Sequence, residues 1–165
     1  MKNIILISVF LLIFASECQA QTENIKSSDN VKKQAQQMGN FLIAKNYKEY
    51  IKFTYPAILE MLGGYDKGLA YITNAFKETE KEGVELKIIT FENLSEFIKT
   101  ETELQCTISA VFEYSSPVPI KALKTTMIGI STNNGENWYF VDTYGSDLKS
   151  LKEYLSTLSD KLIIK

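Results

Sequence analysis

Residues 104–114 read LQCTISAVFEY, and the alternation within this stretch decides the fold. Leucine, cysteine, isoleucine, alanine, phenylalanine and tyrosine occupy every second position, and most of the positions between them are polar. A period of two predicts a β-strand with one buried face and one more polar face. The buried face needs an apolar layer from elsewhere in the chain to cover it.

Further strands are predicted on both sides of this one. Residues 84–91 alternate, and a change of parity between Ile88 and Ile89 indicates a β-bulge. Residues 120–131 form the next strand, and NNGEN at 133–137 predicts a hairpin turn. The last strand is WYFVDT at 138–143. We therefore expect a curved antiparallel sheet.

The chain before these strands has the period of amphipathic helices, from residue 31 to about residue 82. Its apolar residues recur at spacings of three and four, and Gly63-Gly64 marks a sharp turn. Asp66 is the predicted N-cap of the helix that follows this turn. At the other end of the chain, leucines at 148, 151, 155 and 158 predict a C-terminal helix.

These patterns predict an α+β fold, in which N-terminal helices pack on a curved antiparallel sheet that is cone-shaped and is followed by a C-terminal helix. The predicted organisation has three parts: a signal peptide at 1–20, a polar disordered tether at 21–30, and a single domain at 31–165. The length of 165 residues is that of one domain with a substantial core.

The first twenty residues have the pattern of an export signal. Lys2 precedes an apolar run, and a more polar stretch leads to Ala20, after which we expect cleavage. The run is too short for a comfortable membrane span, so we expect none in the mature chain. We therefore expect a periplasmic or extracellular protein. The alternative is a lipoprotein anchored at Cys18, although Glu17 before it is not the small residue that such processing prefers.

Composition excludes several classes of chemistry. The chain has no histidine, which removes His-based triads, metal sites and acid/base chemistry. All 18 basic residues are lysines and the net charge is −2, so we expect no nucleic-acid binding. The carboxylates of the stretch KETEKEG are spread around a helix and form a solvated face. We expect neither a bound metal nor a cofactor.

The chain resembles the nuclear transport factor 2-like superfamily, whose members are also described as SnoaL-like or cystatin-like. The resemblance rests on NYKEYIKFTYPAILEMLGG at 46–64, the amphipathic helix after it, and the strand pair ending NNGENWYFVDTYG at 133–145. It is closest to small exported members from Bacteroidetes-type bacteria. The resemblance implies a cone of helices and sheet around a pocket. It implies no single activity, because the superfamily holds isomerases, cyclases, dehydratases and noncatalytic proteins.

Aromatic and acidic residues are the candidates for such a pocket. The pocket candidates are Tyr50, Tyr55, Tyr71, Cys106, Trp138, Phe140 and Asp142. Asp142 and Tyr55 are the candidate catalytic residues, as a desolvated base and a hydrogen-bond donor. For each candidate the simpler interpretation is a packed or surface side chain, and for Cys106 it is a buried apolar filler.

Three functions remain open at this point. The first is a noncatalytic module that binds a small apolar or amphipathic ligand. The second is a protein that forms a homodimer through the polar sheet face, which carries Gln105, Thr107 and Ser109. The third is an isomerase, cyclase or dehydratase, which requires Asp142 and a tyrosine to meet at one cavity.

Overall fold

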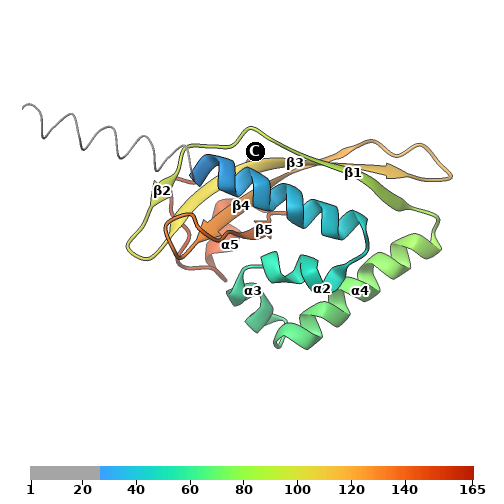
Figure 1. Cartoon of the computed structure of the whole chain (residues 1–165), viewed down its shortest axis with the longest axis horizontal. Coiled ribbons are helices and arrows are strands. Elements are labelled where there is room, and N and C mark those ends of the chain that lie inside the picture. The colour runs from blue at the N-terminus through green and yellow to red at the C-terminus, as the bar shows by residue number, and fades with distance from the viewer. Residues whose placement is uncertain (1–26) are drawn as a thin grey trace, which may run out of the picture.

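The computed structural model describes residues 27–165, so the predicted signal peptide, its cleavage site and Cys18 lie outside the described residues. The fold is α+β as predicted, and N-terminal helices precede a five-stranded antiparallel sheet and a short C-terminal helix (Figure 1). Within the described residues, no helix combines the length and the apolar character that crossing a membrane requires.

The first helix covers residues 27–43 and is called the N-terminal helix below. Its predicted stripe is confirmed, because Val31, Ala35, Met38 and Leu42 are all buried. The helix begins earlier than predicted, since residues 27–30 had been assigned to the disordered tether. Asn30 explains the difference: its amide donates hydrogen bonds to the main-chain carbonyls of Gly135 and Glu136, at 2.6 and 2.7 Å. Polar residues are therefore ordered here by contact with a distant hairpin.

Three short helical segments and one long helix follow, and Figure 1 shows them grouped beside the N-terminal helix. They are α2 (Tyr47–Tyr50), the 3-10 turn η1 (Ile51–Phe53), α3 (Pro56–Met61) and the long α4 (Tyr65–Lys81). Proline at the start of α3 suits a position that needs no amide donor. The predicted N-cap of α4 is wrong: Gly64 occupies that position with φ of 100°, and Asp66 lies in the first turn.

The sheet has the strand order β1-β3-β4-β5, with the short β2 paired to β3. The strands are β1 (Glu85–Glu92), β2 (Ile98–Lys99), β3 (Leu104–Ser115), β4 (Leu123–Ser131) and β5 (Tyr139–Asp142). The predicted bulge is confirmed by a register shift between Leu86 and Ile88. β2 was not predicted, because two residues carry no readable period. β5 is shorter than predicted: Trp138 precedes it, and its amide donates to the Gln34 side chain at 2.9 Å.

The two faces of the sheet are covered by different parts of the chain. One face packs against the N-terminal helix, and this cluster includes Cys106, Ile108, Met127, Trp138 and Phe140. The opposite face carries Ile128, Ile130 and Val141, which pack against leucines of the C-terminal segment. The N-terminal helix thus covers one face of the sheet, and the C-terminal segment covers part of the opposite face.

The C-terminal segment differs from the prediction in its conformation. Helix α5 spans only Leu148–Lys152, so the helix predicted to continue to Leu158 is wrong beyond that point. Beyond this helix the segment is held by Gln105, which is fully buried in β3. Its side chain donates to the Thr157 carbonyl at 3.0 Å and accepts from the Ser159 amide at 2.9 Å. These main-chain groups bond to the sheet instead of to the next helical turn.

Candidate functional site

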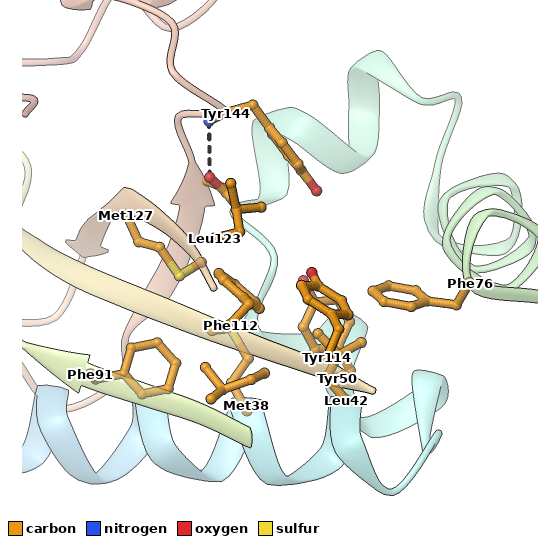
Figure 2. A pocket seen from close by; sticks show the side chains of 13 residues that line it. Met38, Leu42, Tyr50, Phe76, Phe91, Phe112, Tyr114, Leu123, Met127 and Tyr144 are labelled. Atoms are coloured by element: carbon orange, nitrogen blue, oxygen red, sulfur yellow. Dashed lines mark hydrogen bonds between the residues drawn. The ribbon is translucent and has the colours of Figure 1, made fainter. Parts of the chain in front are cut away.

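A cavity lies between the N-terminal helix, the first face of the sheet, and helices α2 and α4 (Figure 2). We call it the tyrosine-rimmed cavity. It is lined by Met38, Gly39, Leu42, Tyr50, Phe76, Ile89, Phe91, Phe112, Tyr114, Leu123, Met127, Asp142 and Tyr144. The folding pattern explains this composition, since the inward-facing positions of β3 and β4 meet the apolar stripe of the N-terminal helix here.

The cavity has a volume of about 60 Å³. A water-sized position requires roughly 10–15 Å³, so the space corresponds to roughly four to six such positions. Large side chains such as Phe91, Phe112 and Met127 project toward it and occupy most of the space between helices and sheet (Figure 2). The cavity therefore matches a small molecule, or the short end of a larger one.

The opening of the cavity carries its polar groups. Asp142 is the last residue of β5, and its Oδ1 accepts hydrogen bonds from Thr125 Oγ1 at 2.7 Å and from the Tyr144 amide at 2.9 Å. Tyr144 is 83% exposed and has φ of 47°, in a left-handed turn after the strand. In Figure 2 its ring stands across the opening and directs its hydroxyl toward Tyr50 and Tyr114. Three tyrosines and one carboxylate thus surround the entrance.

The charge of Asp142 reaches the neighbouring tyrosines. Burial raises the pKa of Tyr50 well above its ordinary value, and the neighbouring Tyr144 and Asp142 add to the shift. Burial and Asp142 also raise the pKa of Tyr114. Both hydroxyls are therefore neutral hydrogen-bond donors near pH 7, and the entrance disfavours any additional negative charge.

Two of the predicted pocket residues line this cavity together: Tyr50 and Asp142. Three others belong to the core and do not line it. Cys106 is fully buried, and burial raises the pKa of its thiol to about 12, which keeps it unreactive. Trp138 donates from Nε1 to the Gly135 carbonyl at 3.0 Å and stacks on Phe97 with ring centroids 5.5 Å apart. Phe140 is buried in the same cluster.

The remaining two candidates, Tyr55 and Tyr71, are displaced from the cavity. Tyr55 lies on the opposite face of the sheet, where its hydroxyl donates to Glu103 Oε1 at 2.5 Å. The chain reaches that side at the sheet edge, where Thr54 forms a bridge with Phe140. Tyr71 is 64% exposed on the surface of α4. The pairing of Asp142 with Tyr55 as catalytic residues is therefore not supported by their positions.

Sequence reasoning missed several lining residues. Phe112 and Tyr114 were on the predicted inward face of their strand, and Met38 and Phe76 were on predicted helix stripes. Their periodicity predicted buried positions, but it could not show that these side chains border a cavity. Tyr144 carried no such signal, because it reaches the cavity from a turn that has no period.

The polar sheet face that was predicted to form a dimer interface is partly covered by the chain itself. Gln105 and Thr107 are buried, and Ser159 and Thr157 bond directly to Gln105. Ser109 remains partly accessible. The part of the face that carries Gln105 and Thr107 is therefore not free to contact a second copy of the chain.

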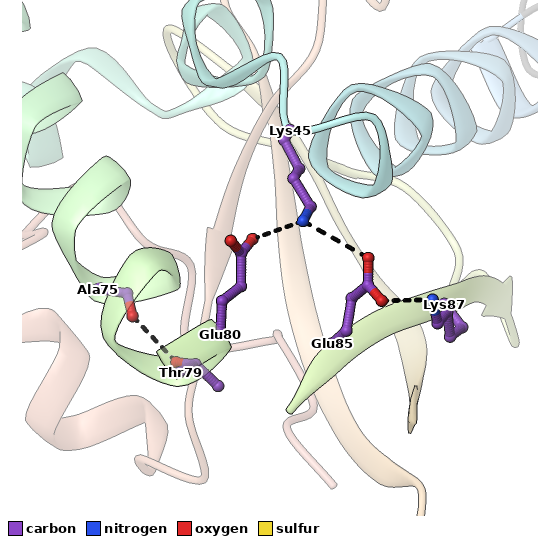
Figure 3. Close-up of polar contacts among 6 residues, drawn as sticks. All are labelled: Lys45, Ala75, Thr79, Glu80, Glu85 and Lys87. Carbon is purple, nitrogen blue, oxygen red and sulfur yellow. Dashed lines mark hydrogen bonds and ion pairs between the residues drawn. The ribbon is translucent and has the colours of Figure 1, made fainter. Parts of the chain in front are cut away.

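A network of ion pairs lies where the end of the N-terminal helix meets α4 and β1 (Figure 3). Lys45 Nζ lies 3.1 Å from Glu80 Oε1 and 3.5 Å from Glu85 Oε1, and Lys87 Nζ lies 2.5 Å from Glu85 Oε2. Lys87, then Lys45, hold the pKa of Glu85 below its ordinary value. The network joins the end of the N-terminal helix to α4 and β1. Its groups are solvated, so these ion pairs contribute little to stability.

Within residues 27–165, no cluster of three or more histidine, cysteine, aspartate or glutamate side chains is placed to hold a metal ion. Comparison of the chain with protein-family models, with curated proteins and with solved structures finds no match in any of the three. The function must therefore be argued from the geometry of the tyrosine-rimmed cavity.

Proposed function

We propose that this protein is a noncatalytic module, exported from the cell, that binds a small apolar or amphipathic ligand in the tyrosine-rimmed cavity. One observation carries the proposal: a cavity walled by apolar side chains has its polar groups gathered at one opening. Ligand sites in proteins commonly combine an apolar lining with a few placed polar groups. The leader pattern at residues 1–20 supports export.

Membership of the nuclear transport factor 2-like superfamily is part of the proposal. It is supported by the arrangement of N-terminal helices on one face of a curved antiparallel sheet, with a cavity between the two layers. The strand pair that carries the resemblance, β4 and β5, supplies Met127 and Asp142 to that cavity.

An enzyme of the isomerase, cyclase or dehydratase type is the second candidate, because Asp142 and Tyr50 border the same cavity. Among the described residues that line the cavity, Asp142 is the only carboxylate, so a second acid or base would have to be a tyrosine. Burial raises the pKa of Tyr50 and of Tyr114, which disfavours loss of a proton from either hydroxyl. We therefore rank binding above catalysis.

Native mass spectrometry of the full chain purified from its own host tests the proposal. We expect a reproducible extra mass of a small molecule on the folded protein. Leu123→Trp should abolish it, because this side chain lines the cavity and is 50% exposed, so a larger ring can enter the opening without disrupting the core.

Val118→Trp is the matched control, since Val118 is 65% exposed on the connection between β3 and β4 and does not line the cavity. It should retain the extra mass. A wild-type protein that carries no small molecule, or a mass that persists equally in both variants, would contradict the proposed site.

A further inference from the structure

The charges around the tyrosine-rimmed cavity are one-sided. Among the described residues that line it, Asp142 is the only one with a charged side chain. Both of the hydrogen bonds to its carboxylate that occur within residues 27–165 end on Oδ1. Its second oxygen, Oδ2, therefore keeps its acceptor capacity for a ligand.

An anionic ligand does not fit this arrangement. A carboxylate or phosphate at the opening would face the Asp142 charge, and no lysine lines the cavity among the described residues. Removing an anion from water without a partner is costly. Tyrosine hydroxyls alone would have to compensate for both the lost hydration and the repulsion.

A cationic group fits the same arrangement in two ways. An ammonium can donate to Asp142 Oδ2, which gives a charge-assisted hydrogen bond. It can also lie against the faces of the tyrosine rings at the opening, where the negative face of an aromatic ring attracts a cation. Tyr144 lies on one side of the opening, and Tyr50 and Tyr114 lie on the other (Figure 2).

The inner part of the cavity limits the size and polarity of the rest of the ligand. Beyond the tyrosines the walls are apolar, with Met38, Leu42 and Phe91 among them. A volume of about 60 Å³ accepts a short hydrocarbon group, roughly four to six heavy atoms when each occupies a water-sized position. A polar group buried there would find few partners.

We infer that the ligand of the tyrosine-rimmed cavity is a protonated amine with a short hydrocarbon group. Its ammonium lies beside Asp142 and the three tyrosines, and its hydrocarbon part lies among the apolar side chains. This inference deepens the proposed function and depends on it. It assigns Asp142 as the specificity-determining residue and Tyr144 as the aromatic wall of the entrance.

Isothermal titration of the full chain with hexylamine, hexanol and hexanoate at pH 7 tests the inference. The three probes share one hydrocarbon chain and differ in charge. We expect hexylamine to bind about ten-fold more tightly than hexanol or better, and hexanoate to bind more weakly than hexanol. Equal affinities for the three, or tighter binding of hexanoate, would overturn the inference and leave the proposed binding function intact.

Two variants identify the residues responsible. Asp142→Asn keeps an oxygen that accepts from Thr125 and from the Tyr144 amide, and should abolish the preference for hexylamine over hexanol. Tyr144→Asn removes the exposed ring and introduces a residue type that tolerates the positive φ of this position, so the protein should fold and bind hexylamine more weakly. Asp66→Asn, an exposed aspartate on α4, is the charge-matched control and should bind like the wild type.

The failures of the two proposals can be separated. If the native protein retains a small molecule that is not an amine and hexylamine does not bind, the amine inference is wrong and the binding function stands. If no probe binds and nothing is retained, both are wrong. Unchanged selectivity in Asp142→Asn and Tyr144→Asn would also overturn the assignment of the amine to this opening.

Discussion

Gly129 and Cys106 provide a direct test of how the first face of the sheet is packed. The two residues are cross-strand partners in β3 and β4. A methyl group on Gly129 would lie 2.9 Å from Cys106 Sγ, 3.4 Å from Trp138 Cε3 and 3.5 Å from Val31 Cγ2. Glycine is present in this strand because the sulfur of Cys106 fills the place of its side chain.

Gly129→Ala should therefore lower the free energy of unfolding. Forcing an extra carbon into a packed core costs about 1–3 kcal/mol. Replacing glycine returns about 0.5–1 kcal/mol of backbone entropy, so we expect a net loss of up to about 2.5 kcal/mol. Cys106→Ala alone should cost about 1 kcal/mol, because it leaves a small cavity in the core.

The double variant carries the decisive comparison. Removing the sulfur makes room for the new methyl group, so Cys106→Ala combined with Gly129→Ala should be more stable than Gly129→Ala alone. Urea unfolding followed by the fluorescence of Trp138, which is buried beside both residues, measures all four proteins. If Cys106→Ala destabilises the Gly129→Ala protein as much as it destabilises the wild type, the packing argument is refuted.

Three further predictions follow from burial. The Cys106 thiol, whose pKa is raised to about 12 by burial, should resist a thiol reagent at pH 8 until urea unfolds the chain. The pKa of Tyr50 is raised in the folded state from its ordinary value of 10.0, so the unfolded chain loses this proton first. The contribution of Tyr50 to stability should be constant below pH 10 and be lost above it, so the fall in stability above pH 10 should be smaller in Tyr50→Phe. Gln105→Met should lower the free energy of unfolding by about 2–4 kcal/mol, because it leaves the Ser159 amide and one oxygen of buried Glu103 without their partner. It should also expose the C-terminal segment to protease. Glu103→Gln should lower the free energy of unfolding by less.

Periodicity was sufficient to predict the buried side of an element wherever that element packs against a single layer. The alternation in residues 104–114 predicted which side of β3 faces the N-terminal helix, and Cys106, Ile108 and Ala110 are indeed buried there. A break in the same kind of pattern between Ile88 and Ile89 predicted a bulge in β1, and the structure has it slightly earlier, between Leu86 and Ile88. Such signals are local, since a strand or helix with one apolar face shows it in its own residues.

Periodicity failed where a contact joins distant segments. The leucines at 155 and 158 have helical spacing and are buried, yet the helix ends at Lys152. Beyond it, main-chain groups of Thr157 and Ser159 bond to Gln105 of the sheet. Tyr55 looked like a partner for Asp142, but the chain carries it to the other face of the sheet. Neither of these arrangements can be predicted from the few residues around it, because each depends on a segment that is distant in the sequence.

The sequence by itself determined the α+β order, the buried stripes and faces, and the absence of histidine and arginine chemistry, because composition and short-range period record those properties directly. Only the tertiary structure decided that Tyr50, Tyr114, Asp142 and Tyr144 meet at one opening. They come from a helix, two strands and a turn, and their convergence depends on how the layers close. A cavity is the volume that packed side chains leave empty, and that difference is set by the whole fold rather than by any one segment.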